Sequence, residues 1–119
     1  MRIQPTRPMR AAIDIGSNTI HLVVARCSPR DLEIVEDQQE LVRIGESVTA
    51  TGEISQEKAK AAIATLKRYK ALARKYKANP ILVVATEAIR QASNSEAFLE
   101  EVFSKTKLTV QLISGTAEA

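Results

Sequence analysis

The 119-residue sequence is poor in the residues that build several common kinds of site. It has no tryptophan, and aromatic residues make up only 3% of it, which argues against base-stacking platforms and so against a specific nucleic-acid partner. The one cysteine, Cys27, permits no internal disulfide and suits a reducing cytoplasm. With a single histidine, His21, a structural zinc site within the chain is excluded as well.

Long apolar runs and the familiar nucleotide-binding loops are also missing. The longest apolar run, Ile81 to Ala85, is strand-sized and far below the ~20 residues that cross a bilayer, so no membrane partner is expected. The four glycines form neither a Walker A loop nor a Rossmann G-x-G-x-x-G fingerprint. Any phosphate must therefore be held by another kind of loop.

The first half of the chain has the pattern of strands separated by turns. Residues 1–10 hold three arginines and two prolines, and we expect a short flexible tail there. Branched apolar residues predict strands at 11–15 and 20–26 that form a hairpin. A more polar third strand at 32–44 is expected at the sheet edge, and a loop is expected from Gly45 to Gly52.

The second half alternates helical and strand patterns. Ser55 is placed to cap a long helix that Asn79-Pro80 ends, and Ile81 to Ala85 follows as a strand expected to be central, parallel and buried on both faces. Ser93 and Glu96 have capping-box spacing before a second helix, and 109–113 predicts a last strand. The order predicts an α/β domain with a mixed five-stranded sheet.

The net charge of +3 is unevenly distributed. Between Ser55 and Lys77 there are eight basic residues against one acid, Glu57, so the rest of the chain carries a net charge of −4. Such a face is able to attract a polyanion, but a solvated outer face whose cations suit the helix dipole is the commoner meaning of the pattern.

Asp14 is the first candidate for chemistry, because it interrupts an apolar strand where burial of an ionised carboxylate is costly. A carboxylate at the end of a strand is able to hold Mg²⁺, and Gly16-Ser17-Asn18 just beyond offers backbone N–H groups to a phosphate. An Asx-type turn cap in a hairpin explains the same residues equally well.

Two further candidates follow apolar strands, where α/β sheets carry their sites. Arg90, after the 81–85 strand, fits a phosphate-binding fork or a surface salt bridge. Glu118, after the last strand, fits a general base, although a glutamate that opens a helix is the commoner meaning.

Three blocks resemble the exopolyphosphatase and guanosine pentaphosphate phosphohydrolase family in order and spacing: Asp14-Ile-Gly-Ser-Asn-Thr19, Ala85-Thr-Glu-Ala-Ile-Arg-Gln-Ala92 and Ile113-Ser-Gly-Thr-Ala-Glu-Ala119. The stretches 41–46 and 51–55 are similar to that family too. The resemblance implies a ribonuclease-H-like half of an actin-like enzyme, in the superfamily of sugar kinases and Hsp70, which removes terminal phosphates from polyphosphate or guanosine pentaphosphate with Mg²⁺.

The resemblance also implies roles and partners. Asp14 would organise the Mg²⁺, Gly16 to Asn18 would form the first phosphate loop, Arg90 would grip a phosphate, and Glu118 would be the base that activates water. The full-length protein would be a cytoplasmic homodimer. Ala117 departs from the family, whose members often have two consecutive glutamates there.

The family's second phosphate loop lies downstream of position 119, so residues 11–119 correspond to the first part of the N-terminal domain and the isolated chain is expected to be inactive. Two alternatives remain. One is another superfamily phosphotransferase, similar to a sugar or acetate kinase, and the other is a non-catalytic module that binds polyphosphate or an alarmone.

Overall fold

Strand β1 (Met9–Ile15) is the central strand of the computed structural model, which describes residues 8–113. It pairs antiparallel with β2 (Thr19–Ser28) and parallel with β4 (Ile81–Ala85). β3 (Asp31–Leu41) pairs antiparallel with β2 at one edge, and β5 (Val110–Leu112) pairs parallel with β4 at the other. The order β3-β2-β1-β4-β5 confirms the predicted mixed five-stranded sheet and the edge position of the third strand.

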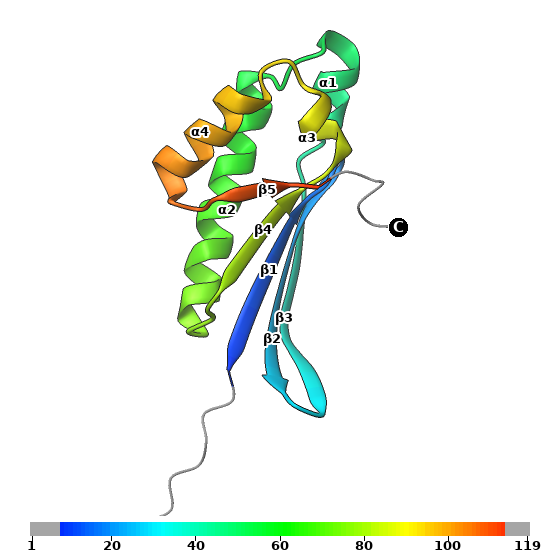
Figure 1. Cartoon of the computed structure of the whole chain (residues 1–119). Helices are drawn as coiled ribbons and strands as arrows, with labels where there is room; N and C mark the ends of the chain where they lie inside the picture. Colours follow the sequence, from blue (N-terminus) through cyan, green and yellow to red (C-terminus); the bar gives the residue numbers. More distant parts are fainter. Residues whose placement is uncertain (1–7, 114–119) are drawn as a thin grey trace, which may run out of the picture.

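The two faces of the sheet have different roles. Along β1, Ile13 and Ile15 are buried, whereas Ala12 and Asp14 on the other face are exposed. Helices α2 (Gln56–Lys75) and α4 (Ser95–Thr106) both lie on the side of the isoleucines (Figure 1). Because the period of a strand is two residues, the alternate positions Ala11, Ile13 and Ile15 of β1 all reach this one core.

Helix α2 begins as the sequence predicts. The Ser55 side chain accepts a hydrogen bond from the Lys58 N–H at 3.1 Å, which satisfies one of the free donors of the first turn. The apolar face of α2 is buried in the core, with Leu66 fully enclosed; it comprises Ala59, Ala62, Ile63, Leu66, Tyr69 and Ala73. The Tyr69 hydroxyl donates to the Ile20 carbonyl at 3.0 Å and so fixes α2 to β2. None of the described helices is both long and apolar enough to span a bilayer.

The predicted loop at 45–52 is wrong, because residues Ile44–Thr51 form helix α1. Gly52 ends the helix in the left-handed region, with φ 81°, and its N–H donates to the Val48 carbonyl. The segment after β4 also contains a short helix, α3 (Glu87–Gln91), which packs against α1. The third strand accordingly stops at Leu41 rather than at Ile44.

Two finer predictions also fail for local reasons. β4 is parallel as predicted, but Leu82 is 45% exposed, because within residues 8–113 helices cover one face of the sheet only. The Ser93 capping box does not form, since α4 begins after Asn94 and the Asn94 amide is occupied by the Ile54 backbone, with two hydrogen bonds of 2.9 Å. β1 starts at Met9, inside the predicted tail, and residues 1–7 lie outside the described part.

Leu66→Ala is expected to lower the free energy of unfolding by about 2–5 kcal/mol, because Leu66 is 0% exposed and its truncation leaves a cavity beneath α2. Leu32→Ala is the matched control: Leu32 is 61% exposed, so its loss changes stability by less than about 0.5 kcal/mol. Urea denaturation followed by circular dichroism measures both. Equal effects of the two substitutions would contradict the position assigned to the core.

Candidate functional site

The turn from β1 to β2, residues 16–18, stands at the carboxyl end of β1. The Gly16 N–H closes the turn by donating to the Thr19 carbonyl at 3.0 Å. Ser17 and Asn18 are exposed, and within the described part of the chain their backbone N–H groups have no hydrogen-bond partner. Two adjacent free N–H donors on an exposed turn are the groups that bind a phosphate oxygen.

The segment that leads into α1 is hydrogen-bonded to the carbonyl groups of this turn. The carbonyl of Ser17 accepts from the Gly45 N–H at 2.8 Å, and that of Asn18 accepts from the Val42 and Arg43 N–H groups at 2.9 and 2.8 Å. The carbonyl groups of Ser17 and Asn18 therefore point toward the segment that leads into α1. The free donors of the turn are left for a ligand.

Gly45 makes this approach possible. A Cβ atom at Gly45 would lie 2.0 Å from the Ser17 Oγ, 3.1 Å from the Ser17 Cβ and 3.3 Å from the Ser17 carbonyl oxygen, so a side chain there must turn the Ser17 hydroxyl aside and crowd the Ser17 backbone. Arg43, two residues earlier, has φ 61°, a left-handed conformation that costs a non-glycine residue about 1–2 kcal/mol. The hollow between turn and helix has a volume of about 380 Å³, and it is lined by Ser17, Asn18, Gly45, Glu46, Thr49 and Ala50.

The sequence analysis did not predict that the start of α1 lies against the turn at 16–18, because it assigned residues 45–52 to a loop. The signal that was available is the spacing of Gly45 and Gly52, seven residues apart, with the second glycine at the position that ends a helix. A glycine at that position is typical of the end of a short helix.

Asp14 is the penultimate residue of β1, in register with His21 on β2 and Val84 on β4. It is exposed on the face opposite α2, so its ionised carboxylate carries no cost of burial, contrary to the expectation from the sequence. The reason is the strand alternation, which directs Ile13 and Ile15 into the core and Asp14 away from it. Within residues 8–113 its carboxylate has no ion-pair partner.

Arg90 lies on α3, next to the same end of β1. The Thr86 N–H donates to the Ile15 carbonyl at 3.3 Å and so ties the start of α3 to that strand. The Arg90 Nη2 donates to Glu87 Oε2 at 2.7 Å, so of the two sequence-based alternatives the surface ion pair is the one observed. The hydrogen bond from Arg90 lowers the pKa of the Glu87 carboxyl below its ordinary value.

The last predicted block starts from this edge of the sheet as well. The Ile113 N–H donates to the Ala85 carbonyl at 3.0 Å, beyond the end of β5. Glu118 lies outside the described residues, so its predicted role is not addressed by the structure. The carboxyl ends of the parallel strands β1, β4 and β5 thus lie side by side, and we name this end of the sheet the carboxyl edge. Open α/β sheets bind ligands at this end of their strands.

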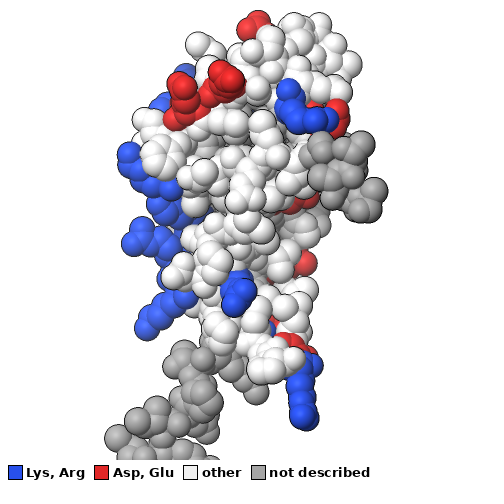
Figure 2. Space-filling model, viewed as in Figure 1, with Lys and Arg blue, Asp and Glu red and all other residues white. Residues whose placement is uncertain are grey.

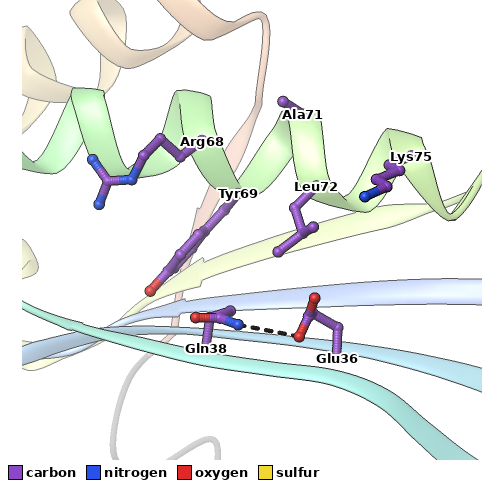
Figure 3. Close-up of a pocket in the computed structure, with 7 residues that line it drawn as sticks. All are labelled: Glu36, Gln38, Arg68, Tyr69, Ala71, Leu72 and Lys75. Atoms are coloured by element: carbon purple, nitrogen blue, oxygen red, sulfur yellow. Dashed lines mark hydrogen bonds between the residues drawn. The ribbon is translucent and has the colours of Figure 1, made fainter.

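A second groove, about 570 Å³ in volume, lies between α2 and β3 (Figure 3). It is lined by Glu36, Gln38, Arg68, Tyr69, Ala71, Leu72 and Lys75. Its polar groups largely satisfy one another: Gln38 donates to Glu36 at 3.1 Å, and Arg68 pairs with Glu40 on the rim. Since it is away from the carboxyl edge of the parallel strands, we do not place the chemistry there.

Among residues 8–113, no three His, Cys, Asp or Glu side chains gather at a point that could hold a metal ion by themselves. His21 Nε2 lies 2.6 Å from Asp37 Oδ1 in a pair that bridges β2 and β3.

Comparison with known proteins identifies the family. The sequence profile of the Ppx/GppA phosphatase family matches residues 23–119, which is most of the chain, and begins after the turn at 16–18. The chain belongs to the Ppx/GppA phosphatase family. Its sheet order and helices are those of the actin-like α/β fold of this family, as the sequence resemblance implied.

Individual Ppx/GppA relatives are longer than this chain. The Aquifex aeolicus Ppx/GppA crystal structure superposes with a TM-score of 0.89 at 35% identity, over 93% of this chain and 36% of that one. A bifunctional 3-dehydroquinate synthase/phosphatase of Fusobacterium nucleatum is 31% identical over 93% of the chain and 18% of that protein. A Haemophilus influenzae protein, whose name gives exopolyphosphatase as a provisional activity, is 27% identical over 92% of the chain and 34% of that protein. The chain thus spans about a third or less of these relatives.

Gly45→Ala is expected to turn the Ser17 hydroxyl aside, to crowd the Ser17 backbone and so to lower the free energy of unfolding by about 1–3 kcal/mol. The amide resonances of Ser17 and Asn18 should shift in a ¹H–¹⁵N spectrum. Gly52→Ala is the matched control: it incurs left-handed strain of about 1–2 kcal/mol, but nothing lies within 4 Å of its Cβ, so those two resonances should stay in place. Unchanged Ser17 and Asn18 resonances in Gly45→Ala would refute the close approach.

Arg90→Gln is expected to raise the pKa of Glu87 toward its ordinary value, because the guanidinium hydrogen bond is the largest cause of the lowering. In the wild type Glu87 therefore stays ionised to lower pH than in the variant. An NMR titration of the side-chain carboxyl carbon measures the change. Lys105→Gln, which removes a lysine paired with Glu101, is the control and should leave the pKa of Glu87 unchanged. A Glu87 pKa that is the same in Arg90→Gln as in the wild type would contradict the pairing of Arg90 with Glu87.

Proposed function

We propose that the full-length protein containing this chain is a cytoplasmic, Mg²⁺-dependent hydrolase of terminal phosphoanhydride bonds in inorganic polyphosphate, guanosine pentaphosphate or both. The observation that carries the proposal is the turn at 16–18. In a chain of a phosphatase family, it presents two free N–H donors at the edge where the parallel strands end.

The donor chemistry beside the turn fits a magnesium ion. Mg²⁺ keeps several of its waters and commonly takes one or two carboxylates together with substrate phosphates, so a single exposed carboxylate suits it better than a closed cage. Asp14 is such a group, exposed and without an ion-pair partner in the described residues. Bound there with the substrate, the ion would neutralise phosphate charge; Asp14 would hold it, directly or through water.

The protein residues would then have separate roles in binding and in proton transfer. The N–H groups of Ser17 and Asn18 would bind oxygens of the terminal phosphate, and Arg90 would exchange its bond to Glu87 for a bidentate contact with the substrate. Glu118 would take a proton from water as the water oxygen attacks the terminal phosphorus. The bridging P–O bond breaks, and the products are orthophosphate and a chain one phosphate shorter.

The chain by itself supplies one wall of such a site. Hydrolysis requires the attacking water, the terminal phosphate and the leaving oxygen to be held in line from opposite sides. We therefore propose that residues 1–119 alone bind the phosphates of the substrate weakly and do not hydrolyse it.

Full-length Glu118→Gln is expected to lose about 10²–10⁴-fold of the rate of phosphate release, because the amide cannot accept the proton of water. Glu96→Gln, on the exposed first turn of α4, is the matched control and should retain wild-type activity. Phosphate release from long-chain polyphosphate and from guanosine pentaphosphate, without ATP, is the measurement.

Each alternative predicts another result. A kinase would consume polyphosphate or ATP only with an acceptor metabolite present. A binding module would retain substrate without releasing phosphate. Wild-type activity in Glu118→Gln would remove Glu118 from the mechanism.

A further inference from the structure

The basic residues of α2 gather on one side of the molecule. Figure 2 shows Lys and Arg side chains along the margin where Figure 1 places this helix, with few acidic neighbours beside the lower part of it. Glu57 is the one acid between Ser55 and Lys77. A helix face of a single sign repels itself, whereas solvated helices usually mix both signs at i and i+4.

The fold accounts for part of this charge only. Arg68 pairs with Glu40 on β3, and the Lys70 Nζ donates to the Thr106 carbonyl at 2.6 Å, which caps α4. Four exposed residues of α2, Lys60, Lys67, Arg74 and Lys75, have no carboxylate partner among residues 8–113. Lys75 lines the groove between α2 and β3, and we name the other three the cation row. The helix dipole favours Arg74 in the last turn but disfavours Lys60 near the start.

The cation row is regularly spaced along the outer face of α2. Its members are seven residues apart, which is two helical turns or about 10 Å, so the row is about 20 Å long. The exposed residues between them on this face, Ala64 and Ala71, are small. An extended ligand is therefore able to lie along the helix and to meet each cation without a bulky side chain between them.

We propose that the cation row binds the distal phosphates of a linear inorganic polyphosphate while its end is processed at the carboxyl edge. This inference rests on the proposed function, which makes a long polyanion the substrate class. The outer face of α2 carries no aromatic residue for base stacking, which favours polyphosphate over single-stranded nucleic acid. α2 also starts beside α1, so the row leads away from the end of the molecule that holds the turn at 16–18 (Figure 1).

The direct test is binding of fluorescently labelled long-chain polyphosphate to the 119-residue chain at several salt concentrations. The triple variant Lys60→Gln/Lys67→Gln/Arg74→Gln should bind about tenfold more weakly at low salt, and the slope of log K against log salt should fall by about 2 in magnitude. Glutamine keeps the helix propensity, so circular dichroism should show a folded chain.

The matched control removes three charges elsewhere, with Arg26→Gln/Arg30→Gln/Lys105→Gln, and brings the net charge from +3 to the same value of zero. It should keep most of the affinity and the slope. Equal losses of affinity in the two triple variants would overturn the proposal that the cation row binds polyphosphate, because binding would then follow net charge alone. The comparison ligand is single-stranded DNA with the same number of phosphates. If it binds as tightly as polyphosphate and loses the same affinity in the row variant, the choice of polyphosphate as the ligand would be overturned.

The full-length enzyme separates this inference from the proposed function. In the row variant, KM for long-chain polyphosphate should rise severalfold, while kcat and the KM for tripolyphosphate should stay unchanged, since a short chain does not reach from the turn along α2. An unchanged KM for long chains would overturn the row and leave hydrolysis standing. Absence of hydrolysis by the wild type would overturn the proposed function itself.

Discussion

The double pairing of β1 is the constraint on which the rest of the structure depends. One side of the strand pairs antiparallel with the next strand of the chain, and the other pairs parallel with β4, about 70 residues later. The parallel pairing brings the segment after β4 beside the turn that follows β1, as the Thr86 to Ile15 hydrogen bond shows. The alternation of the same strand sends Ile13 and Ile15 into the core and leaves Asp14 on the outer face.

The close approach of α1 to the turn adds precision to this edge. A turn held only by its hairpin would be free to move, but three backbone hydrogen bonds and the Gly45–Ser17 contact fix its carbonyl groups. Groups that are fixed before a ligand arrives bind it with less loss of conformational freedom. The strained backbone of Arg43 is consistent with this arrangement, because strain persists only where surrounding contacts impose it.

Patterns that depend on neighbouring residues were readable from the sequence, and features that depend on distant contacts were not. The hairpin, the Ser55 cap and the β4 strand followed from alternation and spacing. Helix α1 did not, because it holds a glycine and several β-branched residues, and packing against the turn and α3 outweighs that weak propensity. Asp14 was correctly placed at a strand end, but its exposure required knowing which face the helices cover. The role of Glu118 stays a prediction.

The central claim is that phosphate binds at the carboxyl edge of β1, between Asp14 and the N–H groups of Ser17 and Asn18. Titration of the ¹⁵N-labelled chain with Mg²⁺ and tripolyphosphate, followed by ¹H–¹⁵N spectra, tests this most directly. The account predicts saturable shifts that are largest at Ser17 and Asn18 and that weaken in Asp14→Asn. Unmoved Ser17 and Asn18 resonances, while amides elsewhere in the chain respond, would contradict it.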